Sequence, residues 1–204
     1  MLKSLSKRDE WAKSVDAASL CPMPEWCEDK LLHELIFSML LWESSIDNAI
    51  KALTKIHEQF VDYNELRVCF PHEIESILGS RYQRATERSE RLIAALRTIF
   101  ENHQQLSLQH LNELTKREAR AYLESLEVLP KFVIARLMLL GLEAHAIPLD
   151  AKLARALHKA GLIHTAKDPD STADVIERVI RASQSLDTYT RLERWLVDFE
   201  NGKS

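Results

Sequence analysis

Asp150 is the residue whose type and position are best suited to chemistry. It follows Pro148 and Leu149 and directly precedes the helix-forming stretch AKLARAL. An acid at a helix start ordinarily accepts a hydrogen bond from a backbone amide of the first turn, so a structural cap is its common role. A carboxylate aimed at the anomeric carbon of a sugar could instead stabilise positive charge there and activate a water molecule. The residues alone leave both roles open.

A proline-marked turn precedes Asp150 in the chain. The stretch LEVLPK ends at Lys131 and leads into FVIARLMLLGL, a pattern that predicts a tight turn followed by an apolar helix. Val128, Leu129 and Pro130 form the centre of this turn. Valine and leucine resist a positive φ and proline has no N–H to donate, so the turn differs from glycine-rich loops whose amides closely approach a phosphate.

Helical patterning extends along nearly the whole chain, so we predict an all-α fold. The sequence has only four glycines, and no alternating run of Val, Ile and Thr is long enough to indicate a sheet. Ser44 or Ser45 and Thr115 are suited to cap helices, while Gly79 and Gly161 are suited to end them. The predicted helices span 31–40, 46–56, 71–79, 88–100, 108–114, 116–126, 151–160, 173–182 and 186–199.

The composition indicates a folded protein without a membrane span. The 204 residues are 46% apolar and 28% charged, which is too hydrophobic for a disordered chain. The longest uncharged apolar run, 35–42, is far shorter than the roughly 20 residues that cross a bilayer. The start MLKSLSKRDEW lacks the apolar core of a signal peptide. We therefore expect a cytoplasmic protein.

Cysteine and histidine usage predicts no metal site and no cofactor. Cys21, Cys27 and Cys69 form no CxxC pair and cannot supply four thiolates to a cluster. The eight histidines form neither an HExxH nor an HxxxH arrangement, so no two of them are placed on one helix face by a known metal-binding spacing. We expect reduced thiols.

Several segments together resemble the helix-hairpin-helix DNA glycosylases of the endonuclease III type. LLHELIFSMLLWESSIDNAIKAL at 31–53 looks like the family's early apolar helix and polar turn. ILGSRYQRATERSERLIAAL at 77–96 resembles its glycine, tyrosine and lysine stretch. The hairpin and PLDAKLARAL follow, and RLERWLVDF at 191–199 looks like the last helix before the family's iron-sulfur loop. The resemblance covers roughly residues 28 to 199.

The resemblance implies two helical lobes that hold double-stranded DNA in the cleft between them. A six-helix lobe at 28–143 would include the hairpin, and 1–27 would join 144–204 in a second lobe that carries Asp150. Asp150 would be the catalytic aspartate, and Ser44 would stand where the family has a glutamine that fills the gap left by a flipped base. The sequence stops where the cluster loop would begin, so we expect a colourless monomer without an iron-sulfur cluster.

Phe132 occupies the position of the family's Schiff-base lysine, with Lys131 beside it. Phenylalanine cannot attack a sugar. One residue along a helix turns a side chain by about 100°, so Lys131 would replace the missing amine only in a hairpin shortened by one residue. The resemblance therefore implies base excision without strand cleavage. A Lys131 that only faces solvent or a phosphate is the alternative.

The net charge of −4 offers no general attraction for DNA, so any DNA-binding surface must be local. The stretch RYQRATERSER places arginines at helical spacing, and we expect Arg84 and Arg88 to face DNA together with the hairpin residues. Lys152, in the helix that follows Asp150, would add a cation. A solvated face on which Glu87 pairs with a neighbouring arginine explains the same pattern.

Three functions follow from these observations. The first is a monofunctional DNA glycosylase that uses Asp150. The second is a DNA-binding or repair-associated protein with the same fold and no catalysis, suggested by the altered hairpin. The third is a helical interaction module without a DNA role, suggested by the acidic balance. We expect Asp150 to start a helix and to open onto the interlobe groove; a buried carboxylate with both oxygens on backbone amides would leave only the capping role.

Overall fold

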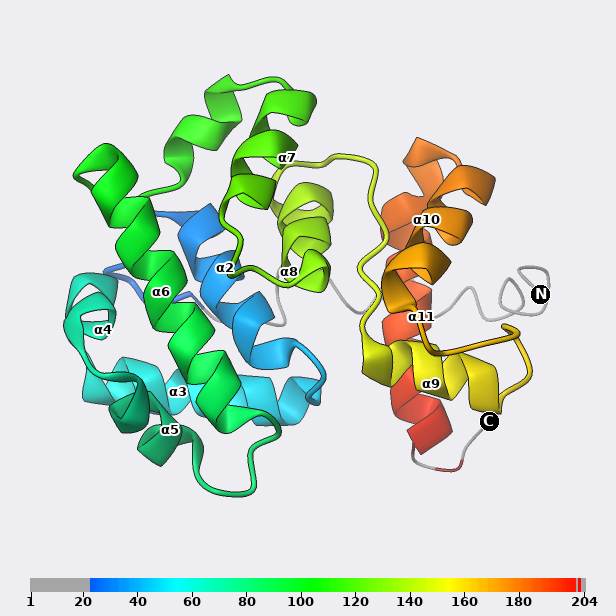
Figure 1. Ribbon diagram of the computed structural model, residues 1–204, viewed down its shortest axis with the longest axis horizontal. Coiled ribbons are helices and arrows are strands. Elements are labelled where there is room, and N and C mark those ends of the chain that lie inside the picture. The colour runs from blue at the N-terminus through cyan, green and yellow to red at the C-terminus, as the bar shows by residue number, and fades with distance from the viewer. Residues whose placement is uncertain (1–22, 201, 203–204) are drawn as a thin grey trace.

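All regular structure in the described part of the chain is helical, as predicted. The computed structural model describes residues 23–200 and 202, and this part contains no strand (Figure 1). The α-helices are α2 (Lys30–Leu41), α3 (Ile46–Gln59), α4 (Tyr63–Val68), α5 (Pro71–Leu78), α6 (Ala85–His103), α7 (Lys116–Ser125), α8 (Lys131–Arg136), α9 (Ala151–Lys159), α10 (Pro169–Val179) and α11 (Ser185–Glu200). Shorter helical turns lie at Gln109–Glu113, Leu137–Gly141 and Ala182–Gln184.

The helix boundaries follow local side-chain chemistry. Ser45 accepts a hydrogen bond from the Asn48 amide at 3.2 Å where α3 begins. Thr115 and Glu118 each accept a hydrogen bond from the other's backbone amide at the start of α7. Gly79 ends α5 with a φ of +86°, a conformation that glycine adopts without Cβ strain. These predicted starts and stops are confirmed.

Two helices differ from the predicted set. Helix α10 begins at Pro169 rather than at 173, because the Asp168 carboxylate accepts a hydrogen bond from the Ser171 amide at 3.0 Å and proline suits the first helical position. Helix α4 is absent from the prediction. Its six residues, capped by Asp62, are too few to form a recognisable apolar period.

The buried apolar residues form two clusters. The larger one draws its buried residues from Cys27 to Ala146 and surrounds α2; the smaller one runs from Ile147 to Leu196 and joins α9, α10 and α11. Tyr189 of α11 belongs to the larger cluster, so α11 contacts both. Figure 1 shows α9, α10 and α11 beside the larger group of helices.

The predicted lobe boundary at 143–144 lies close to the change from one cluster to the other. The division into 28–143 and 1–27 plus 144–204 stays a prediction, and residues 1–22 of it lie outside the described residues.

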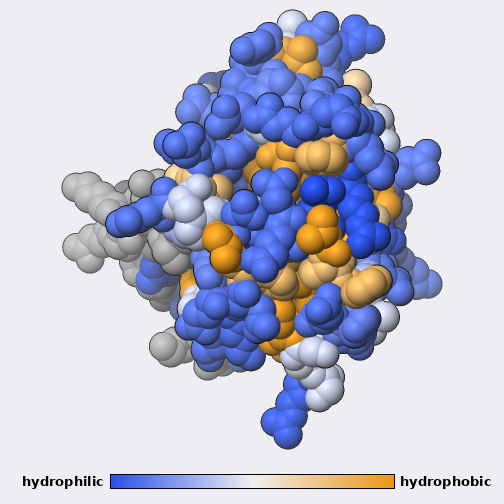
Figure 2. Space-filling view, turned by 90° about the vertical axis from the view of Figure 1, so that its left-hand side faces the viewer, coloured by the Kyte–Doolittle hydropathy of each residue, from blue (hydrophilic) through white to orange (hydrophobic). Residues whose placement is uncertain are grey.

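The outer face of the larger group of helices is mostly hydrophilic. Figure 2 shows that face with separate apolar areas among polar side chains. Val61, Val68 and Phe70, in and beside α4, are large apolar residues with exposed side chains. Scattered apolar side chains of this kind are normal on a protein surface. None of the helices within the described ranges is both long and apolar enough to cross a bilayer.

Candidate interlobe site

Asp150 begins α9 and joins the two groups of helices. Its Oδ1 accepts a hydrogen bond from the Leu153 amide at 2.8 Å, and its Oδ2 accepts one from the Glu43 amide at 2.6 Å. The predicted helix start is therefore confirmed. The prediction that the carboxylate opens onto the groove is wrong for this structure, because Asp150 is only 7% exposed. The turn between α2 and α3 reaches across and covers it.

Burial raises the pKa of the Asp150 carboxyl above its usual value, and the neighbouring Glu43 carboxylate acts in the same direction. The Leu153 and Glu43 amides lower that pKa, as does Lys152. The amides therefore offset only part of the cost of burying the charge. In this structure Asp150 has a capping and bridging role.

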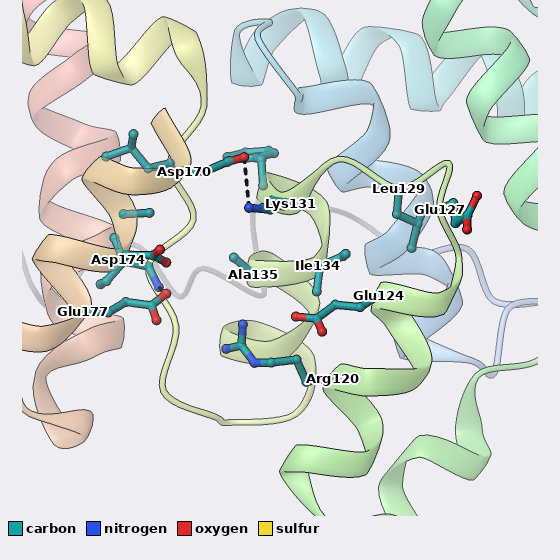
Figure 3. Close-up of a pocket in the computed structure, with 14 residues that line it drawn as sticks. Arg120, Glu124, Glu127, Leu129, Lys131, Ile134, Ala135, Asp170, Asp174 and Glu177 are labelled. Atoms are coloured by element: carbon teal, nitrogen blue, oxygen red, sulfur yellow. Dashed lines mark hydrogen bonds and ion pairs between the residues drawn. The ribbon is translucent and has the colours of Figure 1, made fainter. Parts of the chain in front are cut away.

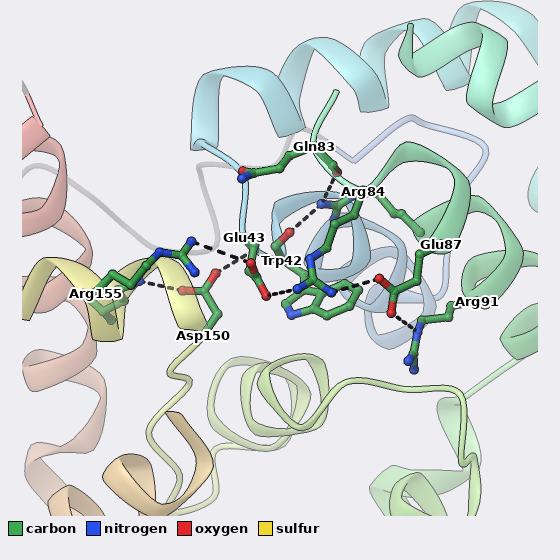
Figure 4. Close-up of polar contacts among 10 residues, drawn as sticks. Trp42, Glu43, Gln83, Arg84, Glu87, Arg91, Asp150 and Arg155 are labelled. Atoms are coloured by element: carbon green, nitrogen blue, oxygen red, sulfur yellow. Dashed lines mark hydrogen bonds and ion pairs between the residues drawn. The ribbon is translucent and has the colours of Figure 1, made fainter. Parts of the chain in front are cut away.

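Glu43 lies at the centre of the polar contacts around Asp150 (Figure 4). Its side chain is 7% exposed and forms ion pairs with Arg84 at 3.3 Å and with Arg155 at 3.7 Å. Its backbone has a φ of +53°, which is unusual for a residue with a side chain. Sequence reasoning left Glu43 out of the site, because nothing in its neighbours in the chain signals a left-handed conformation or contacts with α9.

The expected stripe of DNA-facing arginines does not form. Helix α6 begins at Ala85, and Arg84 before it has a φ of +55°, so Arg84 is not in helical register with the residues that follow. Arg88 is fully buried, and its guanidinium donates to the carbonyl oxygens of Met39, Trp42 and Gln83. The predicted DNA contact by Arg88 is wrong, because a buried guanidinium presents no donor to a phosphate.

Arg84 is 41% exposed, and Lys152 extends from α9 to the α2–α3 turn. Lys152 donates to the Ser44 carbonyl at 3.0 Å and pairs with Glu200 at 3.0 Å. Ser44 itself is only 8% exposed. The structure thus brings Ser44, Lys152 and Arg84 close to Asp150, and their contacts with DNA remain predictions.

The hairpin turn closes without glycine. The Leu129 amide donates to the Leu126 carbonyl at 2.8 Å, and neither Val128, Leu129 nor Pro130 has a positive φ. Leu129 is buried, while Val128 and Pro130 are half-buried. Arg91 of α6 donates to the Val128 carbonyl at 2.9 Å and so fixes the turn from behind. The turn is therefore reshaped relative to a glycine-rich phosphate loop, and its contact with DNA stays a prediction.

Phe132 and Lys131 have opposite environments. Phe132 is 5% exposed and packs in the larger apolar cluster. The Lys131 side chain is 73% exposed and pairs with Asp170 of α10 at 3.4 Å. The amine of Lys131 therefore faces solvent and forms an ion pair between α8 and α10.

Two cavities lie beside the smaller group of helices and differ in charge. One of about 300 Å³ lies between the hairpin with α7 and α8 on one side and α10 on the other (Figure 3). Asp150 does not line it. Its charged lining residues are Glu124, Glu127, Asp170, Asp174, Glu177, Arg120 and Lys131. Such an acidic cavity disfavours a phosphate.

The second cavity, of about 420 Å³, lies along α9 next to Asp150's helix start. Its charged lining residues are Lys152, Arg155, Lys159 and Glu200, and Gln83 completes one side from the loop before α6. Cations therefore outnumber acids here. Within the described ranges, no three His, Cys, Asp or Glu side chains are grouped so that they could hold a metal ion.

No protein-family model and no curated protein matches this chain. Among solved structures, the chain is similar to a thermostable thymine-DNA glycosylase, with a TM-score of 0.58 and 16% sequence identity. The match covers 84% of this chain and 75% of that chain. The likeness establishes the helical DNA glycosylase fold.

Proposed function

We propose that this protein binds double-stranded DNA between its lobes and excises a base as a monofunctional N-glycosylase of the helix-hairpin-helix, endonuclease III-like group. The observation that carries the proposal is the place of Asp150, at the start of a helix on the lobe boundary of a DNA glycosylase fold. A carboxylate there would stabilise positive charge on the sugar or activate a water molecule.

Catalysis by Asp150 requires one of its oxygens to be released. Oδ1 holds the first turn of α9, whereas Oδ2 is held by the Glu43 amide of the other lobe. A small displacement of the α2–α3 turn would free Oδ2 and leave the helix cap intact. Phe132 stands in the lysine position and provides no amine to attack the sugar. After the base is released, the DNA strand would therefore keep an abasic site and stay uncleaved.

A second candidate is a DNA-binding protein with this fold and no catalysis. Both Asp150 oxygens accept hydrogen bonds from backbone amides, and this structural role by itself explains why an acid stands at this position. This observation favours the second candidate.

Asp150→Asn separates the two candidates. We expect it to abolish base release from duplexes with damaged or mismatched bases while largely sparing DNA affinity, because a carboxamide fits the same space but cannot deprotonate water. Base release would be measured as alkali-labile sites across a panel of lesions. Asp168→Asn is the matched control, because Asp168 also caps a helix, at the exposed start of α10.

Asparagine caps a helix about as well as aspartate, so both variants should keep their helix caps while only Asp150→Asn loses activity. Unchanged base release in Asp150→Asn would refute the catalytic role. Tight DNA binding by a wild-type protein that releases no base on the panel would favour the second candidate.

A further inference from the structure

A buried carboxylate bridges two arginines from different lobes. Glu43, with a side chain 7% exposed, pairs with Arg84 of the loop before α6 at 3.3 Å and with Arg155 of α9 at 3.7 Å. The two arginine side chains are 41% and 55% exposed. The Glu43 carboxylate is therefore buried, whereas Arg84 and Arg155 each keep part of the guanidinium exposed to solvent (Figure 4).

The backbone around this ion pair is strained. Glu43 and Arg84 have φ angles of +53° and +55°, and only four non-glycine residues in the described part of the chain have a positive φ. A left-handed backbone is unfavourable for a residue with a side chain, and such strain persists only where other contacts hold it. Here the two strained residues hold each other through their side chains.

A concave and basic cavity leads to Arg155, one of the two arginines. Lys152, Arg155 and Lys159 line it, against the single acid Glu200. Arginine forks bind carboxylate and phosphate oxygens with the same geometry. A phosphate can therefore take the place of the Glu43 carboxylate between Arg84 and Arg155.

We propose that Arg84 and Arg155 form one phosphate-binding site that spans both lobes, and that the Glu43 carboxylate fills it in the ligand-free protein. The assignment of that phosphate to a DNA backbone rests on the proposed function. Displacement of Glu43 also withdraws its amide from Asp150 Oδ2. Phosphate binding thereby exposes the one Asp150 oxygen that is not needed to cap α9.

The site is tested first without DNA. Inorganic phosphate should raise the midpoint of thermal unfolding of the wild-type protein more than sodium chloride does at equal ionic strength. Glu43→Gln should bind phosphate roughly two- to fivefold more tightly, the size expected from losing a competing ion pair with partly exposed arginines. Glu43→Gly removes the same carboxylate and also accepts a positive φ, so it keeps the test valid if the glutamine variant is poorly folded.

Arg155→Gln should lose the specific phosphate effect. Its matched control is Arg191→Gln, because Arg191 also pairs with a carboxylate, Asp187 at 2.9 Å, on the same lobe but on α11. Both substitutions remove one positive charge. A loss of phosphate binding in Arg155→Gln alone would therefore come from a local site and not from the change in net charge.

The second part uses a duplex oligonucleotide and fluorescence anisotropy over a range of salt concentrations. Both Glu43 variants should bind DNA more tightly than the wild type, again roughly two- to fivefold. Arg155→Gln should weaken binding and reduce the slope of log K against log salt by about 1, with no such change in Arg191→Gln.

The two arms separate the site from the proposed function. Specific phosphate binding without DNA binding would support the site and overturn the DNA function. DNA binding that responds equally to Arg155→Gln and Arg191→Gln, and not at all to the Glu43 variants, would overturn the site and leave the DNA function standing.

Discussion

At the scale of single residues, the side chains at the start of α8 limit the chemistry that the fold can perform. Strand cleavage by a glycosylase needs an amine that attacks the sugar and holds it as an imine. Phe132 is buried among apolar residues and has no such group. Lys131 extends to solvent and pairs with Asp170 on the acidic side of the lobe boundary, away from the residues that line Asp150.

We predict that the wild-type protein forms no borohydride-trapped complex with abasic DNA, because no amine lies in the lysine position. The measurement is a gel assay for a covalent adduct after reduction. Lys131→Gln is the control if an adduct appears. An adduct that disappears in this variant would identify Lys131 as the nucleophile and show that the resemblance aligns the hairpin one residue away from its true register.

At the scale of secondary-structure elements, the turn before α8 depends on α6. It closes through the Leu129 amide and the Leu126 carbonyl, and the Arg91 guanidinium holds the Val128 carbonyl from outside. Arg91 also pairs with Glu87 one helical turn earlier, at 3.0 Å. The sequence suggested this pair as part of a solvated face, and the structure adds the anchoring of the hairpin.

We expect Arg91→Gln to destabilise the protein by about 1 kcal/mol more than Arg191→Gln, since Arg91→Gln also breaks the hydrogen bond to the Val128 carbonyl of the turn. Both substitutions break an ion pair between residues four apart on a helix. Urea unfolding measures the stability, and hydrogen exchange at Leu129 reports on the turn. Equal stabilities with unchanged exchange would show that the turn is held without Arg91.

At the scale of the whole molecule, one buried arginine joins α11 to the larger group of helices. Arg136 of α8 is 4% exposed and pairs with Glu34 of α2 at 2.9 Å. It also donates to the Ser38 hydroxyl at 2.9 Å and to the Tyr189 hydroxyl of α11. Burial raises the pKa of the Tyr189 hydroxyl, so this group stays neutral beside the guanidinium. The network therefore fixes α11 against the larger group of helices.

We predict that Arg136→Met lowers the free energy of unfolding by about 3–5 kcal/mol, because it leaves the Glu34 carboxylate without its buried partner. Tyr189→Phe removes only one hydroxyl and should cost about 1 kcal/mol. Chemical denaturation of the two variants under the same conditions makes the comparison. Similar losses in both would show that apolar packing, and not the charge network, holds α11 in place.

The sequence by itself determined the features that depend on neighbours in the chain. Helical periodicity, the scarcity of glycine, the caps at Ser45 and Thr115 and the start of α9 at Asp150 all involve contacts within one or two helical turns. Such contacts are short in sequence and have strong residue preferences. The resemblance added the fold class, which the structural comparison supports.

Only the tertiary structure decided how those residues are used. The Glu43 amide, which donates a hydrogen bond to Asp150, lies 107 positions from it in the chain. The Met39 and Trp42 carbonyls, which accept hydrogen bonds from the buried Arg88, lie more than 40 positions from that arginine. Burial and left-handed backbone are set by packing between elements, and no local pattern encodes them. The candidate site is therefore centred on Glu43, a residue for which the sequence alone identifies no partner.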